Sequence, residues 1–134
     1  MNKRSYQRFW AIKTLYAMEI HGELDIEISK SLLRINNINF NKMNYTFDIL
    51  NSYINNSSDI EEILIDNSTN YPVNRLPLID LSVIHVALTE IFYLNIPPQI
   101  AINEAVDFSK KYSDSGNYKF VNSILGNIIR NLNA

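Results

Sequence analysis

Apolar side chains recur at helical spacing along almost the whole chain. The densest pattern lies between residues 76 and 94, where one stripe is formed by Leu81, Ile84, Leu88 and Ile91 and further apolar residues occupy the other faces. A helix that is apolar on most sides belongs in the middle of a helical bundle. This segment is therefore predicted to be the central core helix.

Three glycines and four prolines in 134 residues are too few for the turns that many short strands would need. Gly22 suits a helix end and Pro98 a helix start. Ser58 and Glu61 match a capping box, which predicts a separate short helix after a break near residue 56. The pattern predicts an all-α fold, a compact bundle of seven helices over residues 5–21, 24–35, 44–55, 58–66, 76–94, 98–112 and 117–132, with loops at 36–44 and 67–75.

The length predicts a single domain over residues 1–134 with a core of its own. The sequence has no cysteine, which excludes disulfides and thiolate chemistry and fits a reducing cytoplasm. Arg8 and Lys13 interrupt any apolar signal sequence near the start, and no apolar run reaches membrane-spanning length. We expect a cytoplasmic protein without a membrane segment.

Residues that could support catalysis are scattered. His21 and His85 lie far apart in the sequence, without the spacing of metal ligands. Glu61 and Glu62 fit the negative charge that a helix start favours, and no glycine-rich phosphate loop is present. We expect no enzyme activity, no metal and no cofactor.

Positive charge gathers at the beginning of the chain, although the net charge is only −2. Lys3, Arg4, Arg8 and Lys13 all precede the first acidic residue, Glu19. Helix N-termini attract phosphate through their free N–H groups and their dipole, so cations at this end favour an anion site. The alternative is a solvated end whose charges only keep the protein soluble. The residues alone leave both interpretations open.

A second polar group opens the last predicted helix at Lys119, Phe120 and Asn122, where Val121 belongs to the buried stripe. Single-stranded RNA is recognised by a ring for base stacking, a cation for phosphate and an amide for base edges. The alternative is a core phenylalanine beside an asparagine that bonds its own helix.

Several of these motifs together resemble the NusB transcription antitermination family. Near the start they are K-R-S-Y-Q-R at 3–8 and A-I-K-T-L-Y at 11–16, and later I-P-x-x-x-A-I-N-E-A-V at 96–106 and K-F-V-N-x-I-L at 119–125. The resemblance covers residues 3–20 and 75–129, and its C-terminal part is the more specific.

The resemblance implies a NusB-like domain that binds box A RNA of ribosomal RNA operons. Its partner would be NusE, a ribosomal small-subunit protein, within the RNA polymerase antitermination complex that supports processive transcription. By position, phosphates would be contacted by Lys3, Arg4 and Arg8. The RNA surface would be bordered by Tyr16, Lys119, Phe120 and Asn122. The partner-facing side would include Glu90.

The sequence also departs from the family pattern. Ser5 and Tyr6 stand at positions where family members commonly have basic residues, and His85 stands where they commonly have an arginine. Leu81 stands at a position that is frequently basic in the family, and Gly126 stands at one that is often acidic. These changes indicate weaker RNA affinity of this subunit, with more of the binding left to NusE.

The resemblance also raises three further hypotheses. The thinned arginine cluster leaves open a helical protein-binding scaffold with little or no RNA binding of its own. A fragment of a ribosomal RNA methyltransferase is disfavoured, because no cofactor-binding α/β region follows residue 134 in this sequence. A homodimer is possible, and it would cover the surface used for RNA or NusE.

Overall fold

The computed structural model describes residues 2–68 and 73–133, and within them the chain is helical with no strand. The helices are α1 (Lys3–His21), α2 (Ile26–Ile35), α3 (Asn44–Asp66), α4 (Leu78–Tyr93), α5 (Pro98–Tyr112) and α6 (Asn117–Leu132). Two short 3₁₀ turns, η1 (Phe40–Lys42) and η2 (Val73–Arg75), lie in the connections. The all-α prediction is confirmed. Part of the predicted 67–75 loop, residues 69–72, lies outside the described residues.

The predicted count of seven helices is wrong, because the segments 44–55 and 58–66 form one kinked helix. Only Asn56 leaves helical geometry inside α3, with φ −126° and ψ 17°. Its side-chain Nδ2 donates to the carbonyl of Ser52 at 2.8 Å. An amide that bonds a carbonyl one turn earlier competes with the helix and bends it without ending it. The residues taken for a capping box therefore lie inside a continuous helix.

Local caps explain the other boundaries. Asn2 accepts a hydrogen bond from the Ser5 N–H at 2.7 Å, so α1 begins two residues earlier than expected. Asp25 caps α2 in the same way through the Glu27 N–H, which moves that start from residue 24 to Ile26. Gly22, with φ 86°, ends α1 as predicted.

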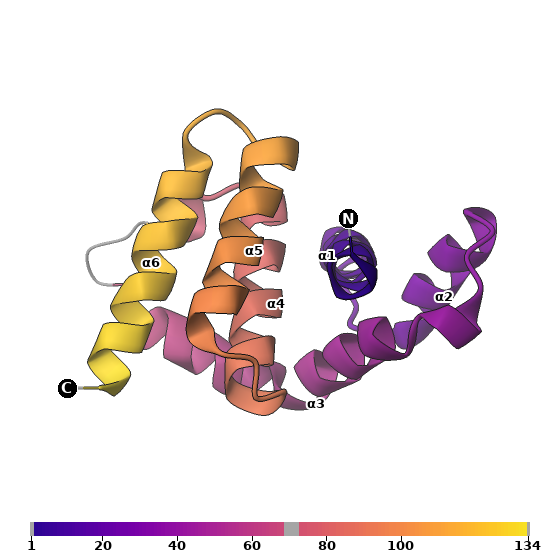
Figure 1. Ribbon diagram of the computed structural model, residues 1–134, viewed down its shortest axis with the longest axis horizontal. Helices are drawn as coiled ribbons and strands as arrows, with labels where there is room; N and C mark the ends of the chain where they lie inside the picture. The colour runs from indigo at the N-terminus through magenta and orange to yellow at the C-terminus, as the bar shows by residue number, and fades with distance from the viewer. Residues whose placement is uncertain (1, 69–72, 134) are drawn as a thin grey trace.

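Helix α4 lies at the centre of the molecule, as the sequence predicts. It packs against α1, α3, α5 and α6, and it is buried at Asp80 and from Ser82 to Glu90. Figure 1 shows α4, α5 and α6 side by side, with α1 seen end-on beside α5 and α2 beyond it. None of the helices in the described ranges is long and apolar enough to cross a membrane.

A buried carboxylate fixes the turn between α5 and α6. Asp80, near the start of α4, is completely buried and accepts hydrogen bonds from Ser109 at 2.9 Å and Ser113 at 2.6 Å. Asn117, the first residue of α6, donates to the same carboxylate at 3.2 Å. One side chain of α4 therefore sets where α5 ends and where α6 begins.

We expect Asp80→Ala to lower the free energy of unfolding by about 1–3 kcal/mol, because it leaves buried donors without an acceptor. Urea unfolding followed by circular dichroism measures the change. The exposed turn residue Asp114 gives a matched control, and Asp114→Ala should change the free energy by less than about 0.5 kcal/mol. Equal losses in the two variants would contradict the anchoring role of Asp80.

Candidate nucleic-acid interface

One face of α1 lies against the end of α5. Phe9, Lys13 and Tyr16 are spaced so that they share this face. The Phe9 ring lies 5.4 Å from that of Tyr112 and 5.9 Å from that of Phe108, measured between centroids. Lys13 is exposed and Tyr16 half-buried. The expected place of Tyr16 at the border of an RNA surface stays a prediction.

The first two turns of α6 present the polar group that the sequence singles out. Lys119 and Asn122 are exposed, Phe120 is half-buried, and Val121 is completely buried in the core. Gly116 adopts φ 91° just before α6, a left-handed conformation that favours glycine and turns the chain tightly. Phe120 is thus only partly covered, and Lys119 and Asn122, three residues apart, share an exposed side of α6.

The two regions meet through α5. Figure 1 shows α5 between α1 and α6, and Tyr112, in contact with Phe9, is the last residue of α5 before the turn into α6. Lys110 extends the contact, with its Nζ 4.9 Å from the ring centroid of Tyr118. The Phe9 face of α1 and the start of α6 therefore lie at the same end of α5.

Arg4 lies on a different face of α1. It is exposed, and its guanidinium carbon lies 4.5 Å from the ring centroid of Tyr45, at the start of α3. That distance is typical of a cation–π contact. The cation is held on a ring and still faces solvent, where an anion can reach it.

Arg8 has a different environment from the one that its position in the basic cluster predicts. It is buried, and its Nε and Nη2 donate to both carboxylate oxygens of Glu90, at 2.7 to 3.0 Å. Its Nη1 lies 3.3 Å from the Glu104 carboxylate. The Tyr45 hydroxyl also donates to Glu90. The guanidinium is thus bound on several sides by groups of the protein itself.

The charge of Arg8 persists inside the protein. Burial alone would lower the pKa of Arg8, but the hydrogen bonds and negative charge of Glu90 outweigh it and raise that pKa. Burial and the neighbouring Glu90 charge raise the pKa of Tyr45 as well, so its hydroxyl stays a donor. Bidentate, charge-assisted bonds of this kind are among the strongest in proteins.

Glu90 is completely buried in the described structure, and its carboxylate points into the molecule. The resemblance implied a place near the partner-facing side, and the structure shows its carboxylate binding Arg8. The sequence did contain a signal for such a pair. A charged residue within a helix that is otherwise apolar on most sides requires a buried partner of opposite charge.

A second buried polar cluster was missed by the sequence analysis. His85 on α4 lies between two carboxylates, with its Nδ1 2.9 Å from Glu19 on α1 and its Nε2 3.2 Å from Glu61 on α3. The Tyr53 ring stacks on the imidazole at 5.0 Å between centroids. Burial alone would lower the pKa of His85, but the two carboxylates raise it from 6.5 to about 9. His85 is therefore charged at neutral pH and joins three helices.

The described residues include no group of three or more His, Cys, Asp or Glu side chains arranged to hold a metal ion. The two ring nitrogens of His85 point to different carboxylates, so the three groups do not converge on one position.

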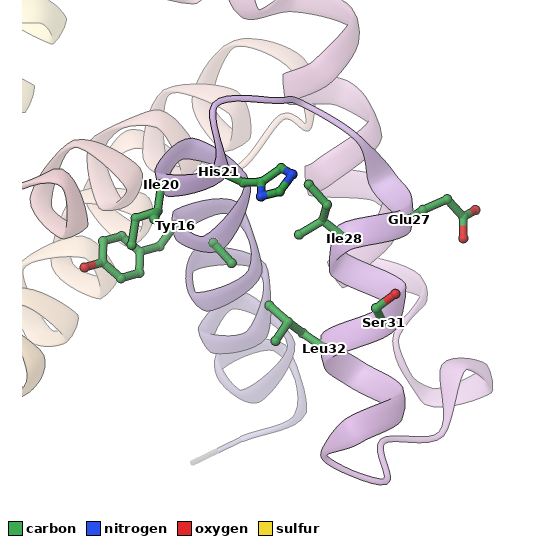
Figure 2. A pocket seen from close by; sticks show the side chains of 8 residues that line it. Tyr16, Ile20, His21, Glu27, Ile28, Ser31 and Leu32 are labelled. Atoms are coloured by element: carbon green, nitrogen blue, oxygen red, sulfur yellow. The ribbon is translucent and has the colours of Figure 1, made fainter.

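An apolar groove lies between the end of α1 and α2. Its volume is about 570 Å³, and Tyr16, Ile20, His21, Ile28 and Leu32 are among the residues that line it. Figure 2 shows Ile28 and Leu32 projecting from α2 towards α1. Tyr16 lies at the border between this groove and the Phe9 face.

Comparison with known proteins shows what the chain is related to. The model of the NusB family matches residues 5–130, nearly the whole chain. The chain belongs to the NusB family. Proteins named transcription antitermination protein NusB from Clostridium novyi and Finegoldia magna share 35% and 32% of their residues with it. These similarities cover 97% and 95% of the chain, and 99% and 93% of the two relatives.

NusB structures also share the fold. A solved complex of the antitermination factors NusB and NusE with double-stranded RNA contains a chain with a TM-score of 0.86 and 25% identity, covering 98% of each chain. The family resemblance inferred from the motifs is confirmed. The names of these NusB proteins describe transcription factors, not enzymes.

We expect Arg8→Ala to lower the free energy of unfolding by about 3–5 kcal/mol, because it leaves the Glu90 charge buried without its partner. The double variant Arg8→Met/Glu90→Met should lose clearly less than the sum of the two single changes, since neither charge remains. Urea unfolding of the wild type, Arg8→Met, Glu90→Met and the double variant measures the coupling. Arg4→Ala is the control and should cost less than about 1 kcal/mol, because Arg4 is exposed. An Arg8→Ala protein as stable as the control would contradict this assignment.

The His85 cluster predicts a pH-dependent stability. The pKa of His85 is raised on folding, so its contribution is fully present below about pH 6.5 and is lost as the pH rises through about 9. The loss is on the order of 3 kcal/mol, and it should be absent in His85→Gln. Urea unfolding at pH 6 and pH 9.5 measures it, with exposed His21→Gln as the control that keeps the wild-type loss. Parallel losses in wild type and His85→Gln would show that the imidazolium contributes nothing.

Proposed function

We propose that this chain is a transcription antitermination factor that binds unpaired box A RNA of ribosomal RNA operons together with NusE. Membership of the NusB family supports the role in antitermination. The similar NusB chain in complex with NusE and double-stranded RNA supports both partners. The protein would act in the cytoplasm, within the antitermination complex on RNA polymerase.

The observation that carries the RNA interface is the contact of Phe9 with Tyr112, which brings one face of α1 to the start of α6. Lys119 and Asn122 are exposed there on one side of α6, and Phe120 is half-buried. We assign base stacking to Phe120 and Tyr16. Lys119 would contact a phosphate and Asn122 a base edge, as unpaired RNA requires.

Lys3 and Arg4 would contact further phosphates, since both are exposed at the start of α1. Arg8 supports the interface from inside. Its bonds to Glu90 hold α1 against α4, so a direct phosphate contact by Arg8 would first have to break a buried bidentate pair. Glu90 would likewise affect NusE only through the position of α1.

A protein-binding scaffold remains the second candidate function. The burial of Arg8 favours it, because one cation fewer is then available to RNA. If two copies of the chain paired through the surface proposed for RNA or NusE, that surface could not bind either of them. Sedimentation with and without RNA tests for such a dimer.

The salt dependence of RNA binding distinguishes the two functions. Arg4→Ala and Lys119→Ala should each reduce the slope of log affinity against log salt by about 0.7, the value for one lost phosphate contact on a single strand. Fluorescence anisotropy with labelled box A and scrambled RNA, with and without NusE, measures the slope. Lys30→Ala, on α2, is the charge-matched control. Unchanged slopes in both variants would favour the scaffold.

A further inference from the structure

A polar cleft lies beside the start of α1, away from the contact with α5. Its volume is about 630 Å³, within the range of about 300–1,000 Å³ in which small-molecule sites fall. The first two turns of α1 form one wall. The connection between α2 and α3, which contains η1, forms the other.

The walls of the cleft are held in place by contacts between α1 and α3. Gln7 Oε1 accepts hydrogen bonds from the Tyr45 N–H at 2.7 Å and the Thr46 N–H at 3.3 Å, and so caps α3 from another helix. The Thr46 hydroxyl donates to the Gln7 carbonyl at 2.7 Å. On the other wall, Asn39 accepts from the Asn41 N–H at 3.0 Å. The cleft is therefore formed before any ligand arrives.

The chemistry of the lining favours an anion that also carries hydrogen-bonding groups. Lys3 and Lys42 both line the cleft, no acidic residue does, and neither lysine forms an ion pair within the described residues. Several amides line it as well. Among the side chains that the structure describes, none is a hydrogen-bond partner for the amides of Asn37, Asn41 and Asn44. An amide can both donate and accept, as the edge of a base requires.

An aromatic ring completes the set. Tyr6 lines the cleft and is 39% exposed. Aromatic rings that solvent can reach can serve as platforms on which unpaired bases stack. Cation, amide and ring thus occur together here, the same combination as at the start of α6.

We propose that this cleft is a second RNA subsite, which holds one unpaired nucleotide with its phosphate near Lys3 and Lys42 and its base between Tyr6 and the asparagine amides. The inference rests on the proposed function, because it extends the same strand. Tyr6 lies between Lys3 and Lys13 around the circumference of α1. The exposed side of α1 therefore connects the cleft with the Phe9 face.

Two substitutions in the far wall test the subsite, because both residues are exposed in η1 and lie outside the α-helices. Lys42→Ala should reduce the salt slope for box A RNA extended by three unpaired nucleotides at each end by about 0.7. Asn41→Ala should weaken binding about three- to tenfold, the effect of one hydrogen bond, and leave the slope unchanged. Fluorescence anisotropy at two salt concentrations measures both.

Lys30→Ala removes the same charge outside the cleft and should bind like the wild type. Equal effects of Lys30→Ala and Lys42→Ala would overturn the subsite, since they would reflect overall charge alone. If Lys119→Ala weakens binding while Lys42→Ala and Asn41→Ala do not, the subsite is overturned and the proposed function stands. If none of the three variants alters binding, both proposals fail.

Discussion

The buried pair of Arg8 and Glu90 is the interaction on which the arrangement of the surface depends. It joins α1 to the central helix, and through Tyr45 and Glu104 it also reaches α3 and α5. The faces of α1 are fixed by it. One face then lies against the end of α5, and another forms the wall of the polar cleft. Arg8, which the sequence analysis placed in a basic surface cluster, is thus buried, and it fixes the orientation of the α1 surface around it.

Helical spacing was sufficient to predict much of the fold. The apolar stripes identified α4 as the core helix, and Gly22 marked the end of α1. The bend at Asn56 was taken for a break, because a local pattern cannot show whether the chain continues in the same direction. Packing of both halves of α3 against the rest of the molecule settles that question, and it is not visible in a short window of sequence.

The candidate site was predicted less completely, for a physical reason. The K-F-V-N segment could be recognised because its cation, ring and amide are neighbours in the sequence. The roles of Arg8 and His85 depend on carboxylates far away along the chain. Only the folded structure brings Glu90 to 2.8 Å from Arg8 and Glu19 to 2.9 Å from His85. Among these groups, Glu90 alone gave a signal in the sequence, since a charge within a mostly apolar helix requires a buried partner, but the sequence did not identify that partner.

Asp80 has one more consequence. Its carboxylate is shut off from solvent and satisfied by two hydroxyls and an amide, all uncharged. Dissolved ions screen exposed charges far more than buried ones, so salt should weaken the hydrogen bonds of Asp80 very little. A rise in ionic strength should thus weaken the interactions of exposed lysines while the α5–α6 turn keeps its shape.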